Sequence, residues 1–158
     1  MNKRDKSIKD ITKKEELNEV IKNTKVCHVG FVDGDMPYVL GFNFGIKDDV
    51  IYLHSAKYGK KIGILKKNNT VCIEFDSGHE FFSRHENVAC SYRMRYKSVL
   101  VYGKAEIVED YDEKIEGLKI FMKNYSDRDF EFRKPSVDNI NIIRIKIDSI
   151  TGRKFEYI

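Results

Sequence analysis

Alternating hydrophobic and polar positions recur along this chain, and the pattern predicts short strands rather than long helices. The clearest example is segment 70–76, in which Val71, Ile73 and Phe75 would face a core while Cys72 and Glu74 face outward. The pair Asp33-Gly34 is a strong hairpin signal between two such segments. By these criteria, strands are expected at 25–32, 37–46, 50–54, 70–76, 97–108 and 143–147.

Helical spacing of apolar residues occurs in three shorter places. The run Thr12-Lys13-Lys14-Glu15 has the form of a capping box and would begin a helix that ends near Asn23. A short helix that carries Ile62, Ile64 and Leu65 on one face is expected, and a third helix after Asp110. Segments 77–87 and 124–138 are predicted connections, and 151–154 a turn. Six antiparallel strands with three irregularly placed helices indicate a mainly β protein, a small barrel with peripheral helices.

The predicted strand 37–46 has two unequal faces. One face carries bulky residues that would fill a core, namely Tyr38, Leu40, Phe42, Phe44 and Ile46. The other carries Val39, Gly41, Asn43 and Gly45, which would form a shallow, flat surface. Glycine inside a strand often marks the close approach of a ligand or another backbone, and the amide of Asn43 could hydrogen-bond a planar heterocycle. A bulge or a barrel bend explains the glycines equally well.

The stretch from Val50 to Ile62 changes character in its middle, and we regard it as the centre of the molecule's chemistry. An apolar strand gives way after Leu53 to small and basic residues, and a helix then begins. Such a turn presents oriented backbone N–H groups that can hold an anion. Ser55 adds a hydroxyl, and positive charge comes from Lys57, Lys60 and Lys61. The turn is too short to wrap a triphosphate, so a single phosphate is expected. The alternative is that these lysines form an ordinary solvated face.

Composition narrows the remaining possibilities. The chain has 158 residues, of which 41% are hydrophobic, so a single domain over residues 1–158 with a proper core is expected. The net charge is +4, but lysines are interspersed with acidic residues throughout, which does not favour nucleic-acid binding. No apolar run approaches the ~20 residues of a membrane span. The charged start, Met1–Lys6, lacks the apolar region of a secretion signal.

Cysteines and histidines show no metal-ligand spacing. Cys27, Cys72 and Cys90 are scattered, which argues against zinc and disulfides and fits a reducing cytoplasm. His28 is predicted to be a hydrogen-bonded core histidine. His79 and His85 lie in the predicted connection 77–87, and no metal site is expected there.

Two runs resemble a known family: Pro37 to Gly45, and Ile51 to Ala56 with Gly59-Lys60-Lys61. They are similar to the pyridoxamine 5′-phosphate oxidase-like, FMN-binding split-barrel superfamily, and within it to the 5-nitroimidazole-resistance (Nim-type) flavoproteins. Cys90 and segments 96–99, 103–105 and 150–152 also look like that group. The resemblance runs from Arg4 to Lys154 and rests on the order and spacing of these elements together.

The resemblance implies a six-stranded antiparallel split β-barrel that forms a homodimer, with two FMN sites at the subunit interface. It would place Leu40, Gly41 and Asn43 along the isoalloxazine ring. The ribityl phosphate would be held by His54, Ser55, Ala56, Lys57, Gly59, Lys60 and Lys61. Ser98 and Val99 would reach the cofactor from the other subunit.

The function implied is that of an FMN-dependent reductase of small aromatic compounds, including nitro-bearing ones. The flavin would carry the electron chemistry, so no catalytic residue is predicted, and His54 is the only proton donor to test. Three alternatives remain open. One is a non-catalytic flavin binder, and another is a plain structural or interaction domain. The third is a haem-binding relative with His28, His54, His79 or His85 as axial ligand. The chain has no tryptophan and no C-terminal arginine-bearing substrate segment, which weighs against oxidation of a B6 vitamer.

Overall fold

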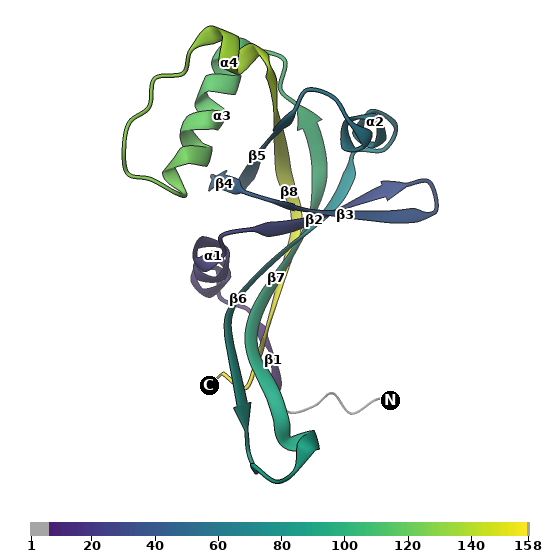
Figure 1. Ribbon diagram of the computed structural model, residues 1–158, viewed down its shortest axis with the longest axis vertical. Coiled ribbons are helices and arrows are strands. Elements are labelled where there is room, and N and C mark those ends of the chain that lie inside the picture. The colour runs from purple at the N-terminus through teal and green to yellow at the C-terminus, as the bar shows by residue number, and fades with distance from the viewer. Residues whose placement is uncertain (1–6, 158) are drawn as a thin grey trace. The chain divides into compact units, whose positions relative to one another are not determined.

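Eight strands and four α-helices form along residues 7–157, the part of the chain that this computed structural model describes (Figure 1). The strands are β1 (Ile8–Ile11), β2 (Cys27–Asp33), β3 (Met36–Phe42), β4 (Phe44–Lys47), β5 (Val50–Ala56), β6 (Thr70–Ser83), β7 (Tyr92–Ile107) and β8 (Ile140–Phe155). The helices are α1 (Lys14–Asn23), α2 (Lys60–Lys67), α3 (Tyr111–Lys123) and α4 (Lys134–Asp138), with a 3-10 turn at Ala89–Ser91.

All eight strands belong to one sheet. Seven of them follow the order β3-β2-β6-β7-β8-β5-β4, and β1 pairs with β8. Strands β3 and β4 stand at opposite ends of this order, yet only Asn43 separates them in the chain. The sheet must therefore curve until its two edges meet near Asn43, as a closing barrel does. The predicted class, mainly antiparallel β with peripheral helices, is confirmed, although the strands number eight rather than six.

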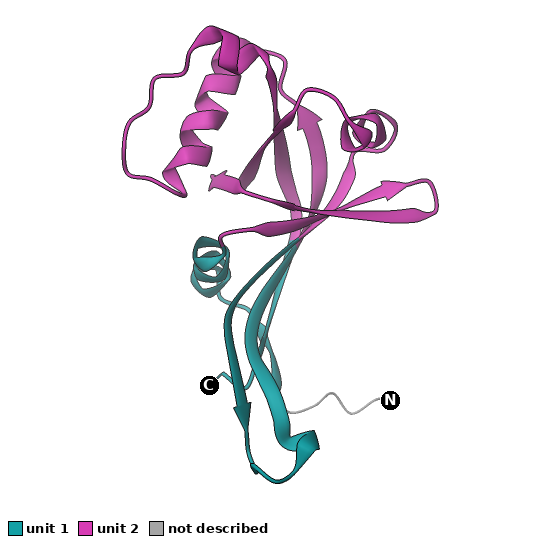
Figure 2. Ribbon diagram, viewed as in Figure 1, with its two compact units in different colours: residues 1–24, 74–100, 150–158 teal, residues 25–73, 101–149 magenta. Residues whose placement is uncertain are grey.

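The chain divides into two compact units, coloured separately in Figure 2. We call residues 7–24, 74–100 and 150–157 unit 1, and residues 25–73 and 101–149 unit 2. Strands β6, β7 and β8 contribute residues to both units. Each unit has its own buried residues and is described by itself.

In unit 2, strand alternation sorts the residues of β5 between two environments. Ile51 and Leu53 are fully buried, whereas the intervening Tyr52 is only half-buried. Helix α3 packs closely on β4 at Gly45. The approach is so close that a Cβ atom added to Gly45 would lie 2.5 Å from the Cα of Phe121. An apolar cluster of Val108, Leu118, Val137 and Ile142 joins α3 and α4 to the sheet.

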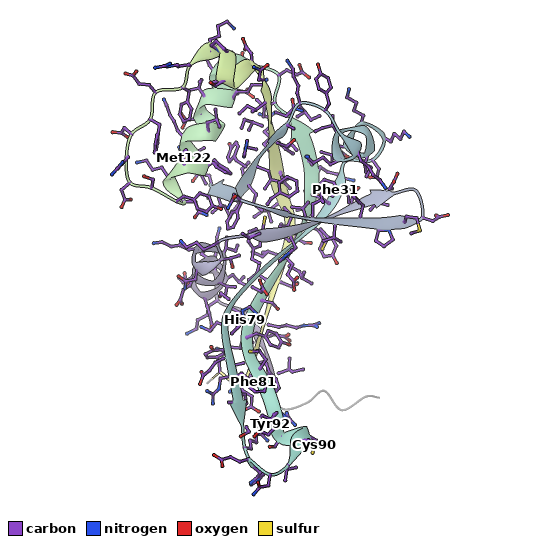
Figure 3. All side chains as sticks on the ribbon, viewed as in Figure 1. Phe31, His79, Phe81, Cys90, Tyr92 and Met122 are labelled. Carbon is purple, nitrogen blue, oxygen red and sulfur yellow. The ribbon has the colours of Figure 1, made fainter. Side chains whose placement is uncertain are left out.

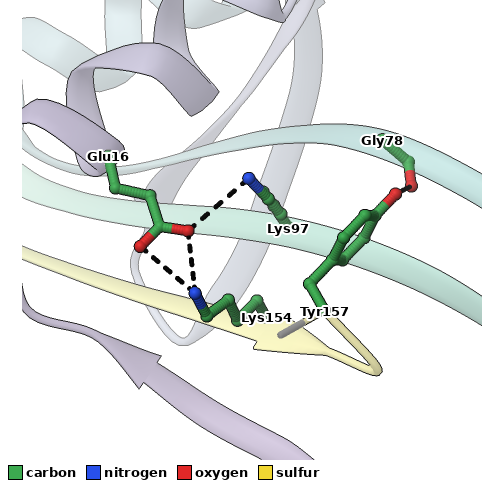
Figure 4. A network of polar contacts seen from close by, with 5 residues as sticks. All are labelled: Glu16, Gly78, Lys97, Lys154 and Tyr157. Carbon is green, nitrogen blue, oxygen red and sulfur yellow. Dashed lines mark hydrogen bonds and ion pairs between the residues drawn. The ribbon is translucent and has the colours of Figure 1, made fainter.

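In unit 1, helix α1 buries Leu17, Val20 and Ile21. Glu16, on the same helix, accepts hydrogen bonds from Lys154 Nζ on β8, the shorter at 3.0 Å, and pairs with Lys97 Nζ on β7 at 3.5 Å (Figure 4). The hydrogen bond from Lys154 is the main reason why the pKa of Glu16 lies below its ordinary value. The pairing ties α1 to two strands.

Several predicted boundaries were wrong. Strand β6 continues to Ser83, so the predicted connection 77–87 is largely strand. Strand β7 begins at Tyr92 rather than Lys97, and the predicted turn 151–154 lies inside β8. In the polar connection 124–138, helix α4 was not predicted.

Three local predictions were also wrong. Strand 37–46 is interrupted at Asn43. Lys13 rather than Thr12 precedes helix α1, and no side chain caps it. His28 lies exposed on β2, because it occupies the outward position between the buried residues Cys27 and Val29. Residues 1–6, which the expectation about a secretion signal concerns, lie outside the described residues.

The three cysteines are free thiols in different surroundings. Cys27 is buried, Cys72 is half-buried and Cys90 is exposed. Burial raises the pKa of the Cys27 thiol to about 12. Among residues 7–157, no helix has the length and apolar character needed to cross a membrane.

Candidate functional site

The N-terminus of helix α2 is open to an anion. Gly59 precedes the helix with φ 126° and ψ 171°, and because it has no side chain it cannot cap the first turn. The first turn also carries no acidic residue. The Ile62 N–H donates to the Gly59 carbonyl at 3.1 Å, which leaves the N–H groups of Lys60 and Lys61 without a partner in the helix, and the helix dipole makes this end positive. An anion placed here would meet the positive end of the helix dipole, although Lys60 at this end already pairs with Asp33.

The three predicted phosphate-binding lysines differ in their partners. Lys57 Nζ donates to the carbonyl of Asp138 at 2.9 Å. Lys60 Nζ pairs with Asp33 Oδ2 at 3.1 Å and also lies 4.7 Å from the centre of the Tyr38 ring. Lys61 is half-buried and has no ion-pair partner within residues 7–157. Lys60 is thus the one of the three that pairs with a carboxylate. Lys57 meets only a carbonyl, and Lys61 has no partner among the described residues, so the charges of both are open to an anion.

The predicted residues of β5 fall on opposite faces of the strand. Ser55 is only 5% exposed, and its hydroxyl donates to the carbonyl of Ala56 at 2.8 Å. His54 and Ala56 are exposed. The His54 ring meets Phe121 edge-on, with 5.3 Å between the ring centres. His54 also lines an apolar pocket of about 270 Å³ formed with α3 and α4.

The small face predicted along 37–46 is present only in part. Val39, Gly41 and Asn43 are exposed, and the Asn43 amide donates to the carbonyl of Lys25 at 3.3 Å. Gly45 is buried beneath helix α3, so the reason for its small size is helix packing and not a ligand. Leu40 is half-buried. A bare stretch of backbone thus remains at Gly41.

Ser98 and Val99 lie on β7 within unit 1. Val99 is fully buried, so only its backbone could reach a ligand. Ser98 lines a pocket of about 520 Å³, together with Asp76 and His79 on β6. Their contribution to a cofactor held by a second subunit stays a prediction. The pairing of His79 with Asp76 was missed because the sequence pattern placed His79 in a loop; the signal that could have revealed it is Gly78.

Known proteins resemble this chain over most of its length. Residues 13–154 match the family profile described as pyridoxamine 5′-phosphate oxidase. A solved structure from Bacteroides thetaiotaomicron, named as a candidate 5-nitroimidazole antibiotic resistance protein, is 37% identical to the chain with a TM-score of 0.84. The alignment covers 94% of this chain and 87% of that one. A comparison with curated proteins gave no match.

More distant structures share the fold alone. The flavocytochrome of Azotobacter vinelandii is 18% identical with a TM-score of 0.79, over 94% of this chain and 70% of that one. An FAD- and haem-binding protein of Mycobacterium smegmatis is 15% identical with a TM-score of 0.83, over 94% and 74%. Since the family profile spans most of the sequence and a structure at 37% identity covers nearly all of it, the chain belongs to the pyridoxamine 5′-phosphate oxidase family.

Proposed function

We propose that this protein binds FMN as a homodimer and acts as a reductase of small aromatic compounds, nitro-bearing ones among them. Membership of the pyridoxamine 5′-phosphate oxidase family supports a flavin as cofactor. The similarity to the Bacteroides protein, whose name refers to 5-nitroimidazoles, supports nitro-aromatic compounds as substrates.

The single observation that carries the proposal is the unbalanced charge at the start of helix α2. Lys61 is half-buried without an ion-pair partner among the described residues, and it stands in a helical turn with no acidic residue and no side-chain cap. A phosphate dianion would satisfy the open N–H groups and balance the lysine at once. The residues present therefore fit the phosphate of FMN.

The chain's residues would each do a limited task. Bound FMN supplies the hydride or electron chemistry. Lys61 and the first N–H groups of α2 would hold its phosphate, and the exposed backbone at Gly41 would let a flat ring lie close. The Asn43 amide would hydrogen-bond the ring edge. Ser98 and the Val99 backbone of a second copy would complete the site.

Titration of the cofactor-free protein with FMN tests the phosphate site. Lys61→Ala should raise the Kd of FMN at least ~10-fold, because a charge-assisted hydrogen bond contributes about 1.5–3 kcal/mol. The matched control is Lys67→Ala, at the exposed C-terminal end of the same helix, which should change the Kd less than ~2-fold. Riboflavin, which lacks the phosphate, should bind Lys61→Ala and the unsubstituted protein equally.

The absorption spectrum and turnover then decide among the functions. Protein that stays colourless and binds no added FMN would refute the proposal. Tight FMN binding without reduction of 2-methyl-5-nitroimidazole, whichever electron donor is supplied, would identify a non-catalytic binder. A Soret band in the purified protein would instead identify a haem protein.

A further inference from the structure

Unit 1 has a pocket of its own, apart from the residues at helix α2. It has a volume of about 520 Å³, within the range of small-molecule sites, and it is formed by the neighbouring strands β6, β7 and β8. Apolar side chains from β7, Met94 and Leu100, line it beside the ring of Tyr96. Charged side chains line it too, among them Asp76, His79 and Arg153. Such a pocket suits a flat ring that bears polar oxygen atoms.

A bulge in β6 brings a histidine into this pocket. In a regular strand, residues three apart point to opposite faces, so His79 should face away from Asp76. Gly78 lies between them with φ 68°, the left-handed conformation that marks a glycine bulge. His79, labelled on β6 in Figure 3, therefore joins Asp76, and its Nε2 lies 3.1 Å from Asp76 Oδ2.

The bulge is held in place by the C-terminal segment. The Tyr157 hydroxyl donates to the carbonyl of Gly78 (Figure 4). A Cβ atom at position 78 would lie 2.9 Å from that hydroxyl oxygen and would displace the end of the Tyr157 side chain, while the φ of 68° is what favours glycine here. The placement of His79 is thus built into the fold.

The Asp76–His79 pair has the arrangement of an oriented proton donor. A carboxylate that hydrogen-bonds one imidazole nitrogen fixes the ring and leaves the other nitrogen for a ligand. Here Asp76 Oδ2 lies 3.1 Å from Nε2, at ion-pair distance, so Nδ1 is the nitrogen that remains for a bound molecule. The two side chains are 48% and 33% exposed, so a small molecule can reach them. Other ionisable groups facing the pocket are Glu74, Tyr96 and Arg153. Arg153 also pairs with Asp10 at 3.9 Å.

We propose that this pocket takes the nitro-bearing aromatic substrate and that His79 donates a proton to a nitro oxygen, with Asp76 as its positioning residue. This inference rests on the proposed function, because the electrons must come from reduced FMN. Ser98 lines the same pocket and is the residue expected to reach the flavin of a second copy. The substrate would therefore lie between the flavin of the second copy and His79.

The reaction balances with one proton from His79. The nitro compound receives a hydride, which is two electrons and a proton, and one further proton. One N–O bond breaks, and the products are the nitroso compound and water. Bound reduced FMN would supply the hydride and would be oxidised, and His79 would regain its proton from solvent.

Nuclear magnetic resonance of the histidine side chains tests the pocket without any turnover. Addition of 2-methyl-5-nitroimidazole should shift the ¹⁵N signals of the His79 imidazole to saturation. The signals of His85, beyond the end of β6, should not move. In Asp76→Asn the His79 signals should change tautomer pattern before any ligand is added. If the ¹⁵N signals of His79 do not shift when the nitroimidazole is added to FMN-loaded protein, the inference is overturned.

Single-turnover oxidation of the reduced protein by the same compound tests the chemistry. His79→Gln should slow it ~100-fold, the lower end of general-acid contributions, and added imidazole should restore part of the rate. Asp76→Asn should slow it ~10-fold, and His85→Gln should not. The Kd of FMN should be unchanged in all three. If His79→Gln reacts at an unchanged rate, this inference is overturned and the proposed function is not. The same holds if His79→Gln no longer binds FMN, because His79 would then contact the cofactor rather than the substrate. Failure of the unsubstituted protein to bind FMN would remove the electron source and overturn the proposed function as well.

Discussion

At Gly45 only a hydrogen atom fits between strand β4 and helix α3. A Cβ atom there would meet backbone, with Phe121 Cα at 2.5 Å and Ile120 C at 2.7 Å, and backbone cannot rotate away as a side chain can. Gly45→Ala should therefore lower the free energy of unfolding by about 1–3 kcal/mol, the usual cost of overpacking. Urea denaturation measures this.

The matched control is Gly63→Ala, at an exposed position of helix α2 where nothing lies within 4 Å of the added atom. Alanine is the better helix former, so this change should raise the free energy of unfolding by about 0.5–1 kcal/mol. If both substitutions stabilised the protein alike, helix α3 could not pack on β4 as described.

Gly41 and Gly45 show what local sequence can and cannot reveal. They occupy equivalent positions in an alternating strand, and both were assigned to the face that could receive a flat ligand, with a bulge or a barrel bend as the alternative. Gly41 is exposed and remains available, whereas Gly45 is covered by a helix about 75 residues later in the chain. Periodicity gives the face on which a residue lies, but it does not say what covers that face, because the cover comes from a distant segment.

At the scale of elements, Glu16 joins helix α1 to strands β7 and β8. Its folded-state pKa lies below the unfolded value, chiefly because of the Lys154 hydrogen bond. The stability that it contributes is therefore complete above the unfolded-state pKa and is lost as pH falls through the folded-state pKa. Glu16→Gln should lower the free energy of unfolding by about 1–2 kcal/mol at neutral pH, and the difference should disappear as pH falls through the folded-state pKa of Glu16.

Denaturation curves across that pH range measure the effect. Glu19→Gln is the matched control, since Glu19 lies exposed on the same helix. It should change the free energy of unfolding by less than ~0.5 kcal/mol at every pH. If Glu16→Gln still has a lower free energy of unfolding in acid, packing rather than charge attaches α1 to the strands.

The strands that the sequence pattern shortened most are those that extend into unit 1. Segments 74–83, 92–100 and 150–155 of the long strands lie in unit 1, and their strand character was missed beyond Asp76, before Lys97 and after Asp148. Alternation is clear where one strand face is buried, but from His79 to Phe81 both faces are exposed. The bulge at Gly78 also shifts the alternation by one residue. The alternation of side chains is therefore interrupted at the bulge that turns His79 toward Asp76.

For the whole molecule, the shared-site hypothesis makes cofactor binding and dimerisation one linked equilibrium. If a second copy completes each FMN site, FMN binds the dimer more tightly than the monomer, and by reciprocity it strengthens the dimer by the same factor. Sedimentation velocity should therefore show a shift from monomer to dimer when FMN is added to dilute protein. Riboflavin should produce a smaller shift, because it lacks the phosphate that Lys61 would hold.

Thermal unfolding gives an independent measure of the same linkage. FMN at about 100 times its Kd should stabilise the native protein by ~2.7 kcal/mol, which raises the Tm by roughly 5–10 °C for a chain of this size. Because unfolding of an assembly releases separate chains, the Tm with FMN should also rise with protein concentration. Lys61→Ala should lose most of the FMN effect and keep the concentration dependence. A Tm shift by FMN that is the same at every protein concentration would mean that each chain binds its cofactor alone, and Ser98 would then have no second site to reach.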